Sequence, residues 1–247
     1  MTATLKDNVN SFNRDVLENK GYVYTTNNRF SSIVANQRQT EATIKAIDPE
    51  SKKILDIGCG DGVYTAKLKA AFPSIAFTGL DPAVEAIRNA EKEYAGISLL
   101  VGNALDTATL QQETYDIGIF RGVLHHTSDP ALAIKNMAKH AEKLIIIEPN
   151  GNNLILKIIE KVSKYHRDHE ERSFFPSVLQ RWCEEAGYEI QSLDYAGFVP
   201  FFFPTLPAKI IYALQPFLET IPVLRNLFSA VSIIQCKKRS QKSDSSK

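Results

Sequence analysis

The stretch Leu55-Asp56-Ile57-Gly58-Cys59-Gly60-Asp61-Gly62 decides the fold of this chain. It joins a short apolar run to an amphipathic segment that continues to about residue 72. Glycines adopt backbone angles that are closed to other residues, and they remove side chains where a ligand must approach. The first turn of the following helix adds unpaired N–H groups and a partial positive charge. The stretch therefore predicts a strand, a ligand-binding turn and a helix.

The spacing of these glycines narrows the choice of ligand. It is Gly-x-Gly-x-Gly, whereas turns that bind dinucleotides have Gly-x-Gly-x-x-Gly. Asp56 lies two positions before the first glycine, and a carboxylate there suits a cationic ligand end better than a pyrophosphate. An NAD-dependent oxidoreductase is therefore a disfavoured alternative.

From residue 52 onward, short apolar runs alternate with amphipathic segments of about ten residues, a pattern typical of βαβ units and a parallel sheet. The pattern predicts seven strands, at residues 53–57, 76–80, 98–101, 115–120, 144–147, 188–195 and 228–236. Helices are predicted at about 63–72, from 82 onward, around 154–162 and at 176–186. We therefore expect a single α/β domain.

Polar residues follow the ends of several predicted strands. Asp81 ends the second strand, where a carboxylate accepts hydrogen bonds from ribose hydroxyls. Asn103 follows the third strand, and its amide can pair with an adenine edge. Residues 121–126, with the sequence Arg-Gly-Val-Leu-His-His, follow the fourth strand. Open α/β sheets bind ligands at the C-terminal ends of their strands, so these residues predict one binding site.

Four segments, at residues 55–62, 79–81, 102–104 and 123–126, together resemble the ubiquinone/menaquinone-type and small-molecule methyltransferases of class I. The resemblance is close over residues 50–150 and loose over the last two strands. It implies a Rossmann-like, seven-stranded, mostly parallel sheet with an antiparallel last strand and helices on both faces. It also implies methyl transfer from S-adenosyl-L-methionine.

The resemblance further implies a role for individual residues. Asp56 and the glycine turn would hold the methionine end of the cofactor, Asp81 the ribose, and Asn103 the adenine. This family often has Asp at the position of Asn103, and an amide can still contact the adenine edge. The expected cofactor-binding residues are Asp56, Gly58, Cys59, Gly60, Asp81, Pro82, Asn103, Ala104 and Arg121.

His125 and His126 are the candidate catalytic residues. Methyl transfer is a direct displacement, in which the protein mainly aligns the nucleophile, the carbon and the sulfur. A general base is needed only if the acceptor must lose a proton, and a histidine suits that role. A base at this position favours oxygen or nitrogen over carbon as the methylated atom. The alternative is that one histidine caps the sheet while the other packs in the core.

Four further residues are expected on the acceptor side: Tyr22, Tyr24, Arg29 and Asn150. The first three belong to residues 1–50, for which we predict a helical N-terminal extension or lid. Asn150 follows the fifth strand, where its alternative role is to form the turn.

Residues 198–227 form a Pro- and Phe-rich insertion in a methyltransferase domain that we expect to span 51–238. Their prolines exclude one long helix, although a short helix such as 208–218 is allowed. Three interpretations remain open for this segment. It forms an internal wall, it covers a lipophilic acceptor such as a quinone or lipid, or it contacts a membrane surface or a second subunit.

Composition excludes several classes of protein. A formal net charge of +1 provides no global field to hold nucleic acid, and the basic tail at 239–247 is expected to be disordered. Three dispersed cysteines argue against a disulfide framework, and the polar N-terminus has no signal core. We therefore expect a cytoplasmic protein.

Two alternatives remain beside a small-molecule methyltransferase. A non-catalytic scaffold or sensor would keep the cofactor site, and a protein or nucleic-acid methyltransferase would share the fold. The Asn-Pro-Pro-Tyr type of motif is absent after the fourth strand, which disfavours the latter. His166 and His169 lie in a charged stretch that is more typical of a solvated face than of metal ligands, so we expect no metal.

Overall fold

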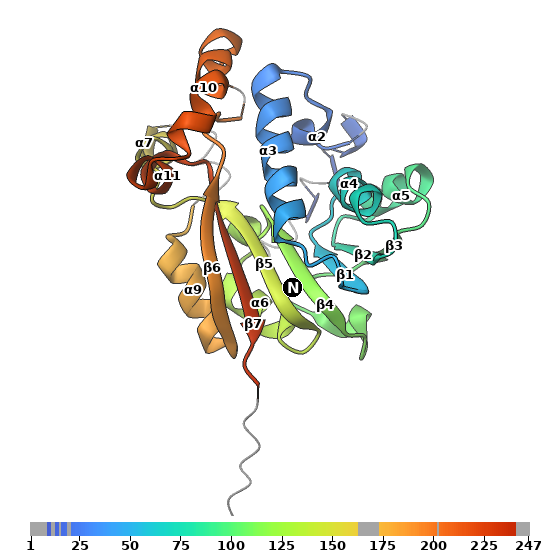
Figure 1. Ribbon diagram of the computed structural model, residues 1–247. Helices are drawn as coiled ribbons and strands as arrows, with labels where there is room; N and C mark the ends of the chain where they lie inside the picture. The colour runs from blue at the N-terminus through green and yellow to red at the C-terminus, as the bar shows by residue number, and fades with distance from the viewer. Residues whose placement is uncertain are drawn as a thin grey trace, which may run out of the picture.

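The computed structural model describes residues 9–10, 13–14, 16–18, 21–162, 173–201 and 203–240. These residues form a sheet with the strand order β3-β2-β1-β4-β5-β7-β6 (Figure 1). The strands are β1 Lys53–Ile57, β2 Ala76–Asp81, β3 Ser98–Val101, β4 Tyr115–Arg121, β5 Ala141–Pro149, β6 Tyr188–Ala196 and β7 Val231–Lys238. Strand β7 runs antiparallel to both β5 and β6, and the other pairs are parallel. The expected seven-stranded Rossmann-like sheet is confirmed.

Helices cover both faces of this sheet. The helices α3 (Phe30–Ala46) and α4 (Val63–Ala71) pack on one face, and α6 (Pro130–Met137) and α9 (Pro176–Glu185) pack on the other. The remaining elements are α2 Val23–Thr26, α5 Val84–Glu93, η1 Thr107–Leu110, η2 Leu124–His126, α7 Leu154–Val162, α10 Thr205–Leu218 and α11 Pro222–Phe228.

Alternation along the strands divides the core into two layers. In β1, Ile54 faces the α3–α4 layer, whereas Leu55 and Ile57 face the α6–α9 layer. In β5 every residue from Leu144 to Ile147 is buried, as the uninterrupted apolar run predicts for a strand covered on both faces. Each such side chain contributes about 1.5–3 kcal/mol by leaving water.

Two strands differ from their predicted bounds by more than one residue, and β2, β4 and β6 each end one residue later than predicted. Strand β5 is longer than 144–147, because its ends also join the sheet: Ala141 pairs with Tyr115, and Pro149 pairs with Val231. Strand β7 begins at Val231 rather than at 228, because the preceding residues continue α11 up to Phe228.

The prolines of residues 198–227 break this segment into two helices, as expected. Pro204 caps α10 and Pro222 begins α11, positions at which a missing N–H costs little. Helix α10 tolerates Pro216 near its C-terminal end. Among the residues that the structure describes, no helix is long and apolar enough to cross a membrane.

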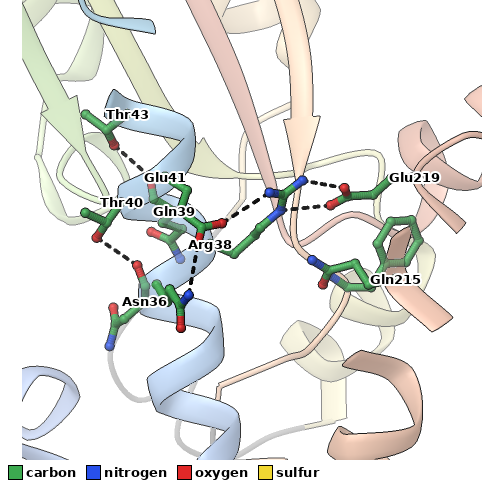
Figure 2. A network of polar contacts seen from close by, with 10 residues as sticks. Asn36, Arg38, Gln39, Thr40, Glu41, Thr43, Gln215 and Glu219 are labelled. Atoms are coloured by element: carbon green, nitrogen blue, oxygen red, sulfur yellow. Dashed lines mark hydrogen bonds and ion pairs between the residues drawn. The ribbon is translucent and has the colours of Figure 1, made fainter. Parts of the chain in front are cut away.

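Helix α10 is fastened to α3, and the two stand side by side at the end of the sheet where β5 leads into α7 (Figure 1). Val34 of α3 packs with Ala208 of α10 in a small apolar cluster. Arg38 of α3 donates two N–H groups to the Glu219 carboxylate, and its Nε lies 3.0 Å from Oε1 (Figure 2). Gln215 is buried beside this pair and accepts a hydrogen bond from the Phe198 N–H.

Some expectations fall on residues that the structure does not describe. His166 and His169 lie outside the described residues, as do residues 241–247 of the tail and most of residues 1–20. The domain boundaries at 50 and 238 and the limits of the insertion at 198–227 stay predictions.

Candidate functional site

The glycine turn between β1 and α4 adopts a backbone that only glycine accommodates. Gly58, Gly60 and Gly62 have φ values of +72°, +58° and +77°, in the left-handed region. A Cβ on Gly58 would lie 2.4 Å from Cγ2 of Val123, and one on Gly60 would lie 2.6 Å from Cε2 of Tyr22. The chain therefore passes close to two neighbours at this turn, and any larger residue would displace them.

Asp81 fastens the end of β2 to this turn. Its Oδ2 accepts a hydrogen bond from the Gly60 N–H at 2.9 Å, and its Oδ1 accepts one from the Ala83 N–H at 2.8 Å. The residue is only 7% exposed. A carboxylate offers about four acceptor positions, so Asp81 retains capacity for the hydroxyls of a ligand.

Three carboxylates surround the turn. Asp56 accepts a 2.5 Å hydrogen bond from the Thr65 hydroxyl, and Asp61 receives the Tyr22 N–H at 3.1 Å. Burial raises the pKa of Asp56 to about 6 and that of Asp81 to about 6, because each charged form is deprived of water. A cationic ligand would relieve this cost, so the turn suits positive charge.

The N-terminal segment covers the turn. The ring of Tyr22 is buried against Gly60 and stacks on Tyr24, with 5.3 Å between ring centroids and 7° between planes. The Asn36 amide of α3 donates a 2.8 Å hydrogen bond to the Tyr24 carbonyl. The structure thus brings both tyrosines to the predicted cofactor turn, whereas Arg29 lies exposed at the start of α3.

Arg121 links three elements at the end of β4. Its guanidinium lies 3.8 Å above the centre of the Tyr64 ring from α4. It donates hydrogen bonds to the Thr40 hydroxyl at 3.1 Å and to the Asn36 carbonyl at 3.2 Å, both on α3. Burial lowers the pKa of Arg121. This cation therefore lies on the same face of the sheet as Asp56, at the strand ends.

The two candidate histidines lie on η2, directly after β4, with ring centroids 3.9 Å apart. Nδ1 of His125 is 2.7 Å from Oε2 of Glu148, a carboxylate with no exposed surface at the end of β5. The other oxygen of Glu148 accepts the N–H groups of Val123 and Leu124, each at 2.7 Å. One buried carboxylate therefore fixes both the turn and the His125 ring.

Glu148 is a residue that sequence reasoning missed. An available signal was its position, because an acid that ends a fully apolar strand is seldom buried without a partner. The sequence shows no partner nearby, since His125 precedes it by 23 positions.

The residues expected to contact the adenine, Asn103 and Ala104, follow the end of β3. Asn103 forms a turn in which its Oδ1 accepts the Leu105 N–H at 2.9 Å. Ala104 is 7% exposed, and its carbonyl accepts a hydrogen bond from the Asn136 amide at 3.1 Å. Both residues follow β3, and Asp81 ends the neighbouring strand β2, so all three lie at the same edge of the sheet.

Asn150 is the predicted acceptor-side residue that the structure places differently. It has no exposed surface, and its amide donates to the carbonyls of Asn226 at 2.8 Å and Ser229 at 3.1 Å. Its Oδ1 accepts the Asn152 N–H at 3.0 Å, which is the turn-forming role left open by the sequence. Because its polar atoms are used in this way, Asn150 ties α11 to the end of β5 instead of facing an acceptor.

The remaining predicted residues complete the set at the strand ends. Cys59 is buried, and a Cβ on Gly79 of β2 would lie 2.7 Å from its sulfur. Pro82 is partly buried directly after Asp81. The predicted cofactor-binding residues therefore gather at the C-terminal ends of β1 to β4, the edge at which open α/β sheets bind ligands.

Comparison with known proteins identifies relatives of this chain. Residues 55–143 match the family model described as "Methyltransferase domain". The chain is 34% identical over 105 residues to the ubiquinone biosynthesis O-methyltransferase of Photobacterium profundum. This aligned segment is 41% of the length of each protein. It is 29% identical over 171 residues to the protein of the same name from Glaesserella parasuis, covering 60% of this chain and 70% of that one.

A solved structure shares the fold. The magnesium protoporphyrin IX methyltransferase of Synechocystis PCC 6803, determined with bound S-adenosylmethionine, superposes with a TM-score of 0.64 at 13% identity. The similarity covers 97% of this chain and 99% of that one, so it extends over both β6 and β7.

Proposed function

Since this chain carries a class I S-adenosyl-L-methionine-dependent methyltransferase domain, we propose that it methylates an oxygen or nitrogen of a small or lipophilic acceptor. The observation that supports cofactor binding is the glycine turn, beside which Asp56 and Asp81 are buried. The names of the two bacterial relatives favour a lipophilic acceptor related to a quinone precursor. The free thiols of its three buried cysteines are compatible with the cytoplasmic location that the sequence predicts, which stays a prediction.

The residues at the turn fit this cofactor. Its bound form supplies an electrophilic methyl group on a cationic sulfonium. In our proposal the carboxylate of Asp56 accompanies the methionine end, and the Asp81 oxygens receive the ribose hydroxyls. Tyr22 and Tyr24 cover the turn and exclude water from it. The chain mainly binds and aligns, and this is the contribution that a direct displacement requires.

The two buried carboxyl groups of Asp56 and Asp81 predict a pH dependence of cofactor binding. Each has a pKa of about 6, above its ordinary value of 3.8, so both take up protons as the pH falls through 6. Their negative charge, which attracts the cation, is lost in that range. We expect affinity to fall by up to about tenfold per pH unit for each proton bound, between about pH 6 and pH 5.

Stability of the ligand-free protein should follow the opposite course. A raised carboxyl pKa stabilises the fold fully below pH 3.8, and this contribution is lost as the pH rises through 6.

Calorimetric titration at a series of pH values measures the affinity for the cofactor. S-adenosylhomocysteine, which lacks the sulfonium charge, is the control and should show a weaker decline. An affinity for S-adenosylmethionine that stays constant down to about pH 5 would contradict the assignment of these carboxylates.

His126 is our proposed general base, with His125 fixed beside it by Glu148. Replacing His126 by alanine should lower turnover about 100-fold at saturating acceptor, while cofactor affinity stays unchanged. The measurement is formation of S-adenosylhomocysteine against pH, with apolar phenols and amines as acceptors. The variant should differ from the parent in the pH dependence of this rate, because it lacks the base. Unaltered turnover in the variant would exclude the base role.

Direct binding tests the proposed function itself. Calorimetric titration with S-adenosylmethionine, S-adenosylhomocysteine and NADH should show binding of the two sulfur ligands and none of NADH. Binding of neither sulfur ligand to folded protein would exclude the proposal and leave a scaffold that has lost its cofactor.

A further inference from the structure

Helix α10 turns its most apolar stripe toward solvent. Leu206, Ile210, Leu214 and Phe217 recur at helical spacing along one side and are 73%, 54%, 51% and 65% exposed. Isolated apolar side chains on a surface need no explanation, but a continuous helical stripe of large ones indicates an interaction site.

The opposite side of α10 shows that this orientation is built into the structure. The side that packs on α3 contains the small Ala208 and the polar Gln215, both buried. Gln215 is satisfied there by the Phe198 N–H at 3.1 Å. The grip of Arg38 on Glu219 fixes the end of the helix in the same orientation (Figure 2). The helix therefore presents its apolar stripe outward, while Gln215 accepts from the Phe198 N–H and Glu219 is held by Arg38.

The charges around the stripe are not balanced. Within residues 198–227 the charged residues are Lys209, Glu219 and Arg225. Glu219 is paired with Arg38, and Arg225 is paired with Asp194. Lys209 is the single charged residue of α10; it is exposed, and its Nζ lies 5.7 Å from the centre of the Phe30 ring of α3. The surface is thus apolar with a positive edge, the combination that an interfacial helix presents to an anionic lipid surface.

Exposed apolar residues also occur on α11 and α7. Helix α11 follows α10 directly and contacts α7. Both present further exposed apolar residues, which are Leu154 at 51%, Ile155 at 50%, Ile158 at 62% and Val223 at 64%. Short amphipathic helices of this kind lie in a membrane interface without crossing it.

We propose that the α10 stripe, comprising Leu206, Ile210, Leu214 and Phe217 with Lys209 at its edge, docks on the surface of an anionic lipid bilayer. The inference rests on this surface alone and does not depend on the proposed methyl transfer. Helix α3 connects this surface to the candidate site. Its Arg38 pairs with Glu219 at the end of α10, and its Thr40 accepts a hydrogen bond from Arg121. Docking there would hold the acceptor side of the enzyme near lipophilic molecules in the bilayer.

The test is flotation of the full-length protein with vesicles. One set contains phosphatidylcholine alone, and the other contains phosphatidylcholine with phosphatidylglycerol. The parent should float with the anionic vesicles, and the double variant Ile210→Ser, Phe217→Ser should bind at least about tenfold more weakly. Lys209→Gln should weaken binding to anionic vesicles several-fold and leave the weaker binding to neutral vesicles unchanged.

A matched control separates a specific surface from general apolarity. Leu132→Ser removes an apolar side chain that is 39% exposed on α6, a helix that packs on the sheet away from α10, and it should leave vesicle binding unchanged. All four substituted side chains are exposed, so circular dichroism should report intact folding. Sedimentation of the parent without vesicles supplies the second measurement. A dimer that Ile210→Ser and Phe217→Ser dissociate, without flotation of the parent, would assign the stripe to a second copy and overturn the proposal. Flotation of the double variant equal to that of the parent, or a monomer that binds no vesicle, would also overturn it.

Discussion

Replacing Glu148 by alanine is expected to lower the free energy of unfolding by about 3–5 kcal/mol, the largest stability effect that we predict for a single polar side chain. The carboxylate has no exposed surface and accepts from Val123, Leu124 and His125. Its removal leaves three donors without their acceptor in a site that water does not reach. Urea denaturation measures the change. The control is Glu142→Ala on the same strand, where the side chain is 64% exposed and the ion pair with Lys238 spans 3.9 Å.

The conservative variant Glu148→Gln separates stability from orientation. A glutamine oxygen can still accept from the two backbone N–H groups, but its amide donates where the carboxylate accepted. His125 would then accept at Nδ1 and carry its proton on the other nitrogen. Nitrogen chemical shifts of the imidazole should report this tautomer change in a protein that remains folded. Loss of less than about 1 kcal/mol in Glu148→Ala would show that the carboxylate does not hold this turn.

Replacing Asp81 by alanine should weaken S-adenosylmethionine binding by about 100-fold or more. The substitution removes the acceptor that holds the Gly60 N–H and, in our proposal, the acceptor for the ribose. It also frees the Ala83 N–H at the start of α5. Calorimetric titration measures the affinity, and Asp81→Asn, which keeps one oxygen, should lie between the parent and the alanine variant.

A control for this substitution exists elsewhere in the chain. Asp129 also accepts a backbone N–H, from Leu132 at 2.9 Å, but it caps the exposed start of α6. Asp129→Ala should destabilise the protein by about 1 kcal/mol and leave cofactor affinity unchanged. Equal affinities of the parent and Asp81→Ala would remove Asp81 from the cofactor site. Equal losses in Asp81→Ala and Asp129→Ala would attribute the effect to stability alone.

The sequence by itself determined the sheet and its ligand edge. The strand at 53–57 was predicted to the residue because its burial from Ile54 to Ile57 calls for a mostly apolar run, which is local information. The glycine turn could also be predicted from local sequence, since Gly58 and Gly60 occupy positions with positive φ, which glycine adopts most readily. Once the parallel order was expected, Asp81 and Asn103 followed as neighbours, because the strands that carry them end at one edge.

Only the tertiary structure decided which distant groups meet at that edge. Glu148 reaches His125 across 23 positions, Tyr22 reaches Asp61 across 39, and Asn150 reaches Asn226 across 76. Such contacts depend on the order in which strands and helices pack, and no periodicity within one segment records that order. The outward stripe of α10 has the same origin. Its apolar spacing is written in the sequence, but whether Leu206 or Ala208 faces the core depends on where α3 lies.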